Sequence, residues 1–344
     1  MSAVRSISII AAMLDEIEHV DDLAHDIAAQ DFDGELEVFV ADGGSTDGSR
    51  QRLQALMEQL DVPFTLIDNP LRFVSPGLNL CIARATGDLV VRLDCHSRYP
   101  RDYVRRCAEA AESTGAWNVG GIAEPLGRTT LERAVACAMA SPFGGINWTR
   151  QGSSRREADT VFLGAFRPIA FEQVGPYDEA FVRNQDDELN LRIRLAGGKV
   201  VLDPAIKATY TPRGSLRAVW RQYRQYGFWK VAVMRKHRQP PGVRSLVPAL
   251  FVLQLATVGG LATVSRTARL LLAADVGFYS LAAFSFAVRA VRQRGEPASL
   301  VPAVVLTFPC FHLGYGTGML EGAVTAIGRR SWRPESTETV GGAE

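Results

Sequence analysis

The sequence predicts an α/β domain followed by an apolar helical region. Two observations indicate this division. Up to about Pro212, short apolar runs alternate with amphipathic segments, as they do in repeated strand–helix–strand units. Beyond Arg213 the character changes, and Ser245 to Ser265 carries no charged residue. A stretch of that length can cross ~30 Å of hydrocarbon as a helix.

Each expected strand is a short apolar run bounded by polar or turn-forming residues. The expected strands are residues 6–11, 36–41, 64–68, 88–93, 117–123 and 199–202. Each expected helix has apolar residues at three- and four-residue spacing. The expected helices are residues 16–29, 47–60, 76–85, 130–139 and 188–196. This alternation predicts an open, largely parallel sheet, in which ligands bind at the carboxyl ends of the strands.

Charge and cysteine content exclude several classes of protein. The net charge is +1, so no overall field favours nucleic acid. The five cysteines are scattered and include no Cys-x-x-Cys pair, which argues against a disulfide framework or a zinc knuckle and for a reducing compartment. The first apolar run is short and meets Asp15 and Glu16 at once, so we expect no signal peptide.

The C-terminal region is predicted to be a membrane anchor with two to three spans between residues 245 and 328. Residues 298–320 carry no charge, although His312 lies among them, and residues 270–288 are similar but contain Asp275. The alternative is a buried hairpin within a soluble domain. A polar tail, residues 329–344, follows the last apolar stretch.

Residues 213–244 form a basic segment with interleaved aromatic side chains, and Pro204 to Ala274 contains no Asp or Glu. At helical spacing, one face carries Trp220, Tyr223, Gly227, Val231 and Met234. This pattern predicts an amphipathic helix at the membrane interface. The same segment offers polar and aromatic groups that could hold a polyprenyl phosphate or sugar acceptor. These candidates are Gln222, Tyr226, Trp229 and Lys230.

Three acidic motifs supply the chemistry. The first, Asp42-Gly-Gly-Ser-Thr-Asp47, follows a buried strand and precedes a helix. Asp42 could accept hydrogen bonds from a ribose hydroxyl or a base, and the following helix offers its N-terminus to phosphate. An ordinary capped turn is the alternative.

The second motif is Asp94-Cys-His96, at the end of another apolar strand. Asp94 and His96 could coordinate one face of a divalent ion, Mn²⁺ or Mg²⁺, and the imidazole favours manganese. A hydrogen-bonded Asp–His pair in a loop is the alternative.

The third motif, Gln185-Asp-Asp-Glu188, lies at the start of an expected helix. Acidic residues in a first turn stabilise any helix through its dipole, and this alone could explain them. A carboxylate at such a helix start is also well placed as a general base.

The order of these motifs, ending in Gln-x-x-x-Tyr-Gly-x-Trp-Lys at residues 222–230, resembles the family 2 glycosyltransferases of the GT-A fold. Within that family the chain resembles the membrane-bound bacterial subgroup typified by a succinoglycan glucosyltransferase. Residues 69–88 and 312–316 also fit the subgroup. The resemblance covers nearly the whole chain, and the combination is specific although each motif alone is not.

The resemblance implies a GT-A catalytic domain over residues 1–212 and a role for each acid. It implies that Asp42 holds the uridine of a nucleotide sugar and that Asp94 and His96 bind metal and diphosphate. Asp186 would be the catalytic base, with Gln185 where the family usually has Glu. Asp15 stands where the family usually has Asn, beside the nucleotide, and Asp47 would also lie near it.

The expected reaction is an inverting transfer of a hexose from a nucleoside-diphosphate sugar to a lipid-linked saccharide or polyprenyl phosphate. Two rivals stay open: a sugar-phosphate nucleotidyltransferase and a non-catalytic, membrane-anchored nucleotide-sugar-binding partner. The basic residues just before the first span predict a multi-pass protein of the bacterial inner membrane, with its catalytic domain in the cytoplasm.

Overall fold

The computed structural model describes residues 3–144, 154–240 and 242–328, which fall into two compact units. Unit 1 comprises residues 1–126 and 148–211, and unit 2 comprises residues 127–147 and 212–344. The polar tail expected at 329–344 lies outside the described residues. Residues 127–147, which the sequence analysis assigns to the α/β domain, group with the C-terminal helices.

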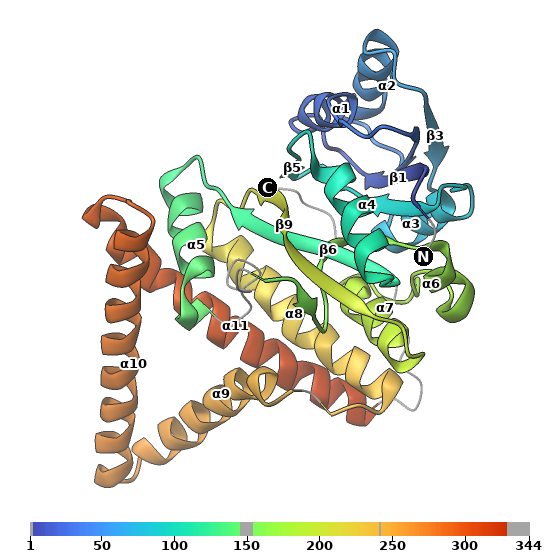
Figure 1. The fold of residues 1–344 in the computed structure, drawn as a ribbon. Coiled ribbons are helices and arrows are strands. Elements are labelled where there is room, and N and C mark those ends of the chain that lie inside the picture. Colours follow the sequence, from blue (N-terminus) through green and yellow to red (C-terminus); the bar gives the residue numbers. More distant parts are fainter. Residues whose placement is uncertain (1–2, 145–153, 241, 329–344) are drawn as a thin grey trace. The chain divides into compact units, whose positions relative to one another are not determined.

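Unit 1 is built on a nine-stranded mixed sheet in the order β3-β2-β1-β4-β8-β6-β9-β5, with β7 paired to β9 (Figure 1). Its strands are β1 Ser6–Met13, β2 Glu35–Asp42, β3 Phe64–Asp68, β4 Leu89–Arg92, β5 Ser97–Arg98, β6 Asn118–Pro125, β7 Arg156–Glu157, β8 Phe162–Phe166 and β9 Val200–Tyr210. The first four strands are parallel, and β8 runs antiparallel between β4 and β6.

The parallel register brings the ends of the first strands to one edge of the sheet. Met13 lies opposite Asp42, and Asp42 lies opposite Asp68. Ile10 lies opposite Arg92, so the segment after β4 leaves the sheet near the segment after β1. The loops that carry the predicted nucleotide and metal residues therefore start from neighbouring strand ends, where ligands of open α/β sheets bind.

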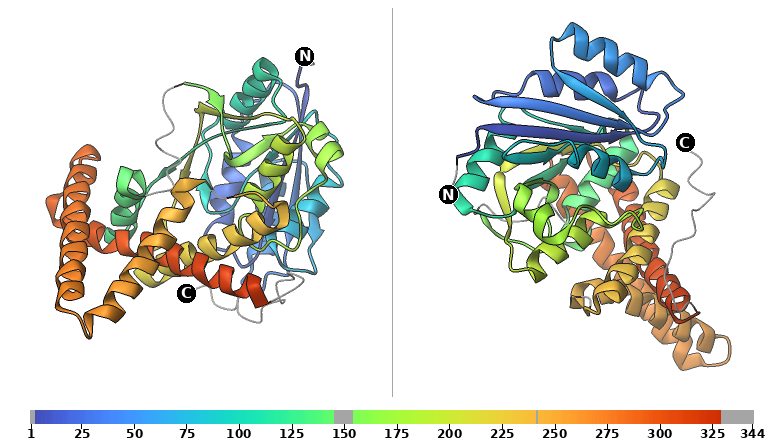
Figure 2. Two further views of the ribbon diagram at one scale, coloured as in Figure 1. Left: turned by 90° about the horizontal axis from the view of Figure 1, so that it is seen from below. Right: turned by 90° about the vertical axis from the view of Figure 1, so that its right-hand side faces the viewer.

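Helices cover both faces of this sheet (Figure 2). They are α1 Val20–Ala28, α2 Ser49–Gln59, α3 Val74–Ile82, α4 Tyr103–Thr114, α6 Pro168–Val174 and α7 Gln185–Leu195. Alternate residues of β1 point to opposite faces: Ile7 and Ile9 pack in one core with Leu23 of α1, and Ile10 packs in the other with Leu78 of α3. The result is a three-layer α/β/α arrangement.

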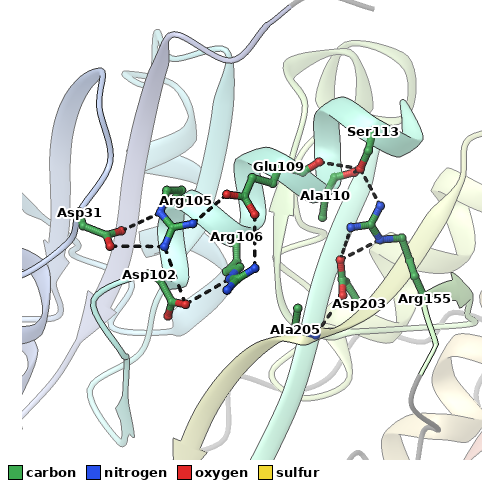
Figure 3. Close-up of polar contacts among 10 residues, drawn as sticks. All are labelled: Asp31, Asp102, Arg105, Arg106, Glu109, Ala110, Ser113, Arg155, Asp203 and Ala205. Atoms are coloured by element: carbon green, nitrogen blue, oxygen red, sulfur yellow. Dashed lines mark hydrogen bonds and ion pairs between the residues drawn. The ribbon is translucent and has the colours of Figure 1, made fainter.

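Ion pairs along α4 account for several acids of unit 1 (Figure 3). Arg105 contacts Asp31 at 3.2 Å and Glu109 at 2.8 Å, while Arg106 contacts Asp102 at 3.1 Å. Nearby, Arg155 donates to Asp203 at 2.7 Å and to Ser113 at 2.6 Å. The pairs of Arg105 and Arg106 are partly exposed and contribute little stability individually, whereas Arg155 satisfies the buried carboxylate of Asp203. The acids within them are not candidates for the site.

The structure differs from the sequence prediction in several elements of unit 1. Helix α1 begins at Val20 rather than at residue 16, because Asp15 has φ of +54° and the next residues form a turn. Strand β9 extends to Tyr210, well beyond the predicted residue 202. Strand β8 and helix α4 were not predicted. Strand β8 is almost fully buried and so lacks the alternation of apolar and polar residues that marks a half-exposed strand, whereas α4 has a clear apolar face that the sequence analysis overlooked.

Unit 2 is helical. It contains α5 Thr130–Ala140, α8 Leu216–His237, α9 Val243–Ala262, α10 Arg266–Gln293 and α11 Val301–Gly328, with short 3₁₀ turns at Pro142–Gly144 and Ala298–Leu300. Helix α5 begins with a capping box between Thr129 and Glu132. Ala134 and Ala138 are buried in the core that α8, α10 and α11 also form. This packing explains why residues 127–147 group with the C-terminal helices.

Helices α8 and α11 run side by side, and the apolar face of α8 packs on α11 (Figure 1). Tyr223 stacks on Phe311 with ring centroids 4.1 Å apart. A Cβ at Gly227 would overlap the carbonyl oxygen of Tyr315. The face predicted to lie on a membrane surface is therefore largely covered by protein within this unit, because a facing helix with several glycines allows close approach.

Three helices of the described chain are long and apolar enough to cross a membrane: Val243–Ala262, Arg266–Gln293 and Ala298–Ile327. Their apolar windows differ in how much protein covers them, being 6%, 11% and 44% buried respectively. Helices α9 and α10 thus expose apolar side chains such as Leu250 and Phe278, whereas α11 forms much of the core of unit 2. These helices coincide with the region in which the sequence predicts two to three spans.

Candidate active site

Loops after β1 and β2 hold one another at the edge of the sheet. The Asp15 carboxylate accepts from the backbone N–H of Thr46 at 2.7 Å, and the Asp15 N–H donates to Ser45 Oγ at 2.9 Å. Asp15 adopts the left-handed backbone conformation, which Asp tolerates better than most residues. Asp15 therefore fixes the loop beside the first acidic motif, with its exposed side chain at the same edge.

Asp47 acts as a brace between the same two loops. Its carboxylate accepts from the backbone N–H of Ile17 at 2.9 Å and from that of Ser49 at 2.9 Å. Burial would raise the pKa of Asp47, but the hydrogen bonds from Ser49 and Ile17 outweigh burial and lower it. Both oxygens of this predicted nucleotide residue are thus engaged by protein donors.

Asp42 ends β2 and is 1% exposed. Its carboxylate accepts from Ser45 Oγ at 2.6 Å and from Arg50 Nη1 at 3.1 Å. Arg50 also donates to Asp68 at 2.7 Å, and the pKa of Arg50 is raised by its hydrogen bonds to Asp42 and Asp68. A nucleotide that reached the Asp42 carboxylate would have to exchange with one of these donors.

Asp94 follows β4, and its Oδ1 is buried without a hydrogen-bond partner among the described residues. Its backbone is fixed, because the Asp94 N–H donates to the Tyr99 hydroxyl at 2.7 Å. A buried carboxylate oxygen without a donor is costly unless a cation or ligand satisfies it. Carboxylate oxygens are the ligands that Mg²⁺ and Mn²⁺ prefer. Asp94 therefore fits the divalent ion that the sequence motif implies.

His96 lies beside two residues that the sequence analysis did not group with it. Its Nε2 is 3.2 Å from Glu16 Oε1, and its ring meets the ring of His19 edge-on at 4.7 Å between centroids. Ligand atoms of Glu16, His19 and His96 all lie within 4.8 Å of one another, and Asp94 is not a member of this group. Burial lowers the pKa of His19, and the nearby His96 lowers it further.

Asp186, in the first turn of α7, is held by Arg92 of β4. Arg92 Nη1 donates to Asp186 Oδ1 at 2.9 Å. Burial would lower the pKa of the Arg92 guanidinium, but its interactions with Asp186 and Tyr177 together outweigh burial and raise it. The Asp186 side chain is 34% exposed, and no hydrogen bond from the described residues engages its Oδ2. One oxygen of Asp186 is thus anchored and the other is open.

The neighbouring acids of α7 have other surroundings. Glu188 is fully buried and pairs with Arg192 at 2.9 Å. Arg192 in turn donates to the carbonyl of Pro176 at 2.7 Å, so this pair fastens the loop after α6 to α7. Asp187 is partly exposed on the same helical turn. Glu188 thus has a structural role, which leaves Asp186 and Asp187 as the accessible carboxylates.

The predicted acceptor residues all belong to α8, which is part of unit 2. Gln222 Nε2 donates to the Tyr226 hydroxyl at 3.1 Å, one helical turn away. Trp229 is buried, and Lys230 is partly exposed. Gln222 and Tyr226 therefore form one polar pair on the helix surface.

Sequence reasoning missed three cations at the strand-end edge of unit 1. Arg92 is a charged residue inside an otherwise apolar strand, and that irregularity could have marked it. Arg50 lies on α2 and bridges two strand-end carboxylates. Arg72 follows β3, is exposed and has φ of +63°. A Cβ added at Gly44 would lie 3.7 Å from Arg72 Nη1, so this cation flanks the first acidic motif.

Comparison with known proteins decides the family. Residues 8–157 match the sequence profile described as Glycosyl transferase family 2. The chain is also 33% identical over 316 residues to the succinoglycan biosynthesis protein ExoA of Rhizobium meliloti (strain 1021), covering 90% of this chain and 92% of that protein. The chain belongs to glycosyltransferase family 2.

A second relative of this family 2 enzyme is archaeal. The dolichyl N-acetyl-alpha-D-glucosaminyl phosphate 3-beta-D-2,3-diacetamido-2,3-dideoxy-beta-D-glucuronosyltransferase of Methanococcus voltae is 22% identical over 329 residues, covering 93% of this chain and 98% of that protein. Among solved structures, the mannosyltransferase PcManGT from Pyrobaculum calidifontis, in complex with GDP-Man and Mn²⁺, superposes with a TM-score of 0.64. It is 17% identical and covers 95% of this chain and 88% of that chain.

The family and fold predictions are confirmed by these comparisons. The protein is a family 2 glycosyltransferase of the GT-A fold. Family membership excludes a sugar-phosphate nucleotidyltransferase as the main interpretation. The roles of individual residues rest on the geometry described above.

Proposed function

We propose that this glycosyltransferase transfers a hexose from a UDP-sugar to a lipid-linked saccharide or polyprenyl phosphate, with inversion at the anomeric carbon. The observation that carries the proposal is the Arg92–Asp186 pair at the end of β4, two residues before Asp94. It sets a carboxylate with one open oxygen beside the strand end where the unpartnered Asp94 oxygen lies.

Asp186 would act as the general base in a single displacement. Its open Oδ2 takes the proton of the acceptor hydroxyl as that oxygen forms a bond to the anomeric carbon. The bond from this carbon to the phosphate oxygen breaks in the same step, and the nucleoside diphosphate leaves. Arg92 positions the base by fixing Oδ1 at 2.9 Å. Displacement from the opposite face inverts the configuration.

Donor binding would use the loops that follow the first four strands. Asp42 and Asp15 would meet the nucleoside, and Asp47 would support them by bracing both loops. The exposed Arg72 adds a cation beside Gly44, where a diphosphate needs positive charge. Asp94 and His96 would hold the divalent ion, Mn²⁺ or Mg²⁺, which neutralises charge on the departing diphosphate when bound.

The acceptor is inferred from unit 2. Helix α8 presents the Gln222–Tyr226 pair next to basic side chains such as Lys230, which suits a phosphate or sugar hydroxyls. The exposed apolar surfaces of α9 and α10 support a membrane-embedded acceptor, because large unpaired apolar surface is stable in lipid. A lipid-linked acceptor would meet both features within this unit.

The proposed location is the bacterial inner membrane, with the catalytic domain in the cytoplasm. We propose that α9 and α10 cross as a hairpin joined by residues 263–265, whereas α11 stays packed within unit 2. Three groups of basic residues then fall on one side of the membrane. They are Arg235 to Arg244, Arg289 to Arg294, and Arg329 to Arg333. This arrangement places all three groups inside, as the positive-inside rule expects, while Arg266 and Arg269 lie at the opposite end of the hairpin; three crossings would also place the last group outside.

A donor screen tests the proposed reaction. The full-length protein in detergent is supplied with individual nucleotide sugars and a membrane lipid extract, and release of nucleoside diphosphate is measured. We expect turnover with a UDP-hexose that requires the lipid extract, and a product of inverted anomeric configuration by NMR. Pyrophosphate release would contradict the proposal, as would donor binding without turnover across all acceptors, which identifies a non-catalytic partner.

A further inference from the structure

Three metal-ligand side chains converge at the start of α1, and His96 is the member that also belongs to the proposed catalytic motif. Glu16 and His19 lie in the turn after β1, and His96 lies between β4 and β5. We propose that Glu16, His19 and His96 form a binding site for a transition-metal ion of the zinc class. This site shares His96 with the ion proposed at Asp94, but Asp94 is not a member of the group, so an ion held here competes with that ion for the His96 imidazole.

The ligand set selects the ion. Two imidazoles and one carboxylate suit Zn²⁺ and similar borderline ions, while Mg²⁺ prefers oxygen ligands. Three protein ligands leave a further position for water or a ligand, as in open zinc sites. The partial exposure of all three residues gives an ion access from solvent.

The distances fit a common centre. Two ligand atoms at ~2.0–2.1 Å from a tetrahedral ion lie about 3.3 Å apart. Glu16 Oε1 and His96 Nε2 are separated by 3.2 Å. The ligand atom of His19 lies within 4.8 Å of both, so a modest rotation of one imidazole ring would bring all three ligand atoms around one ion. An ion pair between Glu16 and His96 would explain their 3.2 Å separation, but it would not explain why His19 also lies beside them.

His19 occupies a position that normally serves a different purpose. It is the N-cap of α1, where Ser, Thr, Asp or Asn usually accepts a hydrogen bond from the helix. The His19 side chain makes no such bond, and its ring is turned toward His96. A residue that caps poorly but faces a histidine and a glutamate is better explained by binding than by helix stability.

The backbone that carries the ligands is fixed from several directions. The Glu16 N–H donates to Ser49 Oγ at 2.7 Å, and the His19 N–H donates to the Glu16 carbonyl at 2.9 Å. His96 immediately precedes β5, whose Ser97 lies opposite Tyr210 of β9. Ligands held in this way lose little freedom when an ion binds, which favours affinity.

Metal binding is tested directly, without a nucleotide sugar, so the result does not depend on the proposed hexosyl transfer. The full-length protein without a histidine tag is stripped of metal in detergent and titrated with Zn²⁺ by calorimetry. Co²⁺ serves as the spectroscopic probe through its visible absorption bands. We expect one Zn²⁺ per chain and Co²⁺ bands typical of low coordination number.

The deciding variant is His19→Asn, which removes the imidazole and supplies a better N-cap, so α1 should form at least as well. We expect its Zn²⁺ affinity to fall by roughly tenfold or more, since even outer-shell losses cost 10–100-fold. Glu16→Gln should behave similarly. His25→Ala, which removes an exposed histidine of the same helix, is the matched control and should bind as the wild type does. Unchanged Zn²⁺ affinity and Co²⁺ spectrum in His19→Asn would overturn the proposal.

Discussion

Replacing Asp186 with Asn tests the proposed general base with little change to the local structure, because the two oxygens of this carboxylate have different surroundings. Oδ1 accepts from the buried Arg92 at 2.9 Å, while the side chain as a whole is 34% exposed. Asparagine keeps an oxygen that can accept from Arg92, but it removes the negative charge and the basicity. The proposed general base is therefore lost while most of the local geometry is retained.

The expected magnitudes follow from this environment. Removing one partner of a fully buried ion pair costs about 3–5 kcal/mol of stability. Since the amide still accepts a hydrogen bond and water reaches Asp186, we expect a smaller loss of about 1–2 kcal/mol. Loss of a general base lowers turnover by about 10²–10⁴, equivalent to about 3–5 kcal/mol in the transition state. The effect on rate should thus exceed the effect on stability.

The assay measures kcat and KM by nucleoside diphosphate release, donor binding by calorimetry, and stability by thermal unfolding. Asp187→Asn is the control on the same helical turn and should remain active. Arg92→Met breaks the same ion pair but spares the carboxylate, so it should lose stability and retain at least about tenfold more turnover than Asp186→Asn. Full activity of Asp186→Asn with an inactive Asp187→Asn would refute the assignment. Equal losses in Asp186→Asn and Arg92→Met would assign the effect to the ion pair.

Four further predictions follow from the structure. A chelator should abolish turnover and Mn²⁺ or Mg²⁺ should restore it, whereas full activity of Asp94→Asn in excess chelator would contradict a metal role for Asp94. Arg72→Ala should raise the KM for the donor by roughly tenfold with little change in thermal unfolding, because the side chain is exposed; an unchanged KM would remove Arg72 from the donor site. Reporter fusions after Arg294 and at Glu344 should both report the cytoplasm, and opposite sides would instead indicate a third crossing. Finally, backbone hydrogen bonds from Arg5 and then Ser6 outweigh burial and lower the pKa of Asp88, so its contribution to stability is present above about pH 3.9 and is lost as pH falls through the folded-state pKa. Asp88→Asn should therefore be less stable than the wild type at pH 7, with the difference shrinking in acid; a difference that does not change with pH would contradict this account.

Much of the fold could be predicted because local patterns agree with the tertiary structure. The strand at residues 64–68 was placed correctly, and the expected strand at 36–41 differs from β2 by one residue at each end. Their buried apolar runs and flanking polar residues leave little choice of structure. Strand β8 escaped prediction because its partners β4 and β6 are distant in the sequence, and Leu163 and Gly164 adopt positive φ.

The candidate site was predicted in part. Placing Asp42, Asp94 and Asp186 required only their positions at the ends of strands or the start of a helix. Their partners could not be inferred, because Arg92 and Asp186 are 94 residues apart and Arg50 bridges two different strands. Such contacts depend on strand order and side-chain direction, which no local pattern records.

By itself, the sequence determined the α/β class, the family, the acidic motifs and the apolar C-terminal helices, because each is written in local spacing and composition. The tertiary structure alone decided which groups meet. It placed His96 with Glu16 and His19, anchored one oxygen of Asp186 on Arg92, and packed α11 within unit 2 while leaving α9 and α10 exposed. The physical reason is that burial and pairing are properties of the packed chain, and residues far apart in sequence share them only after folding.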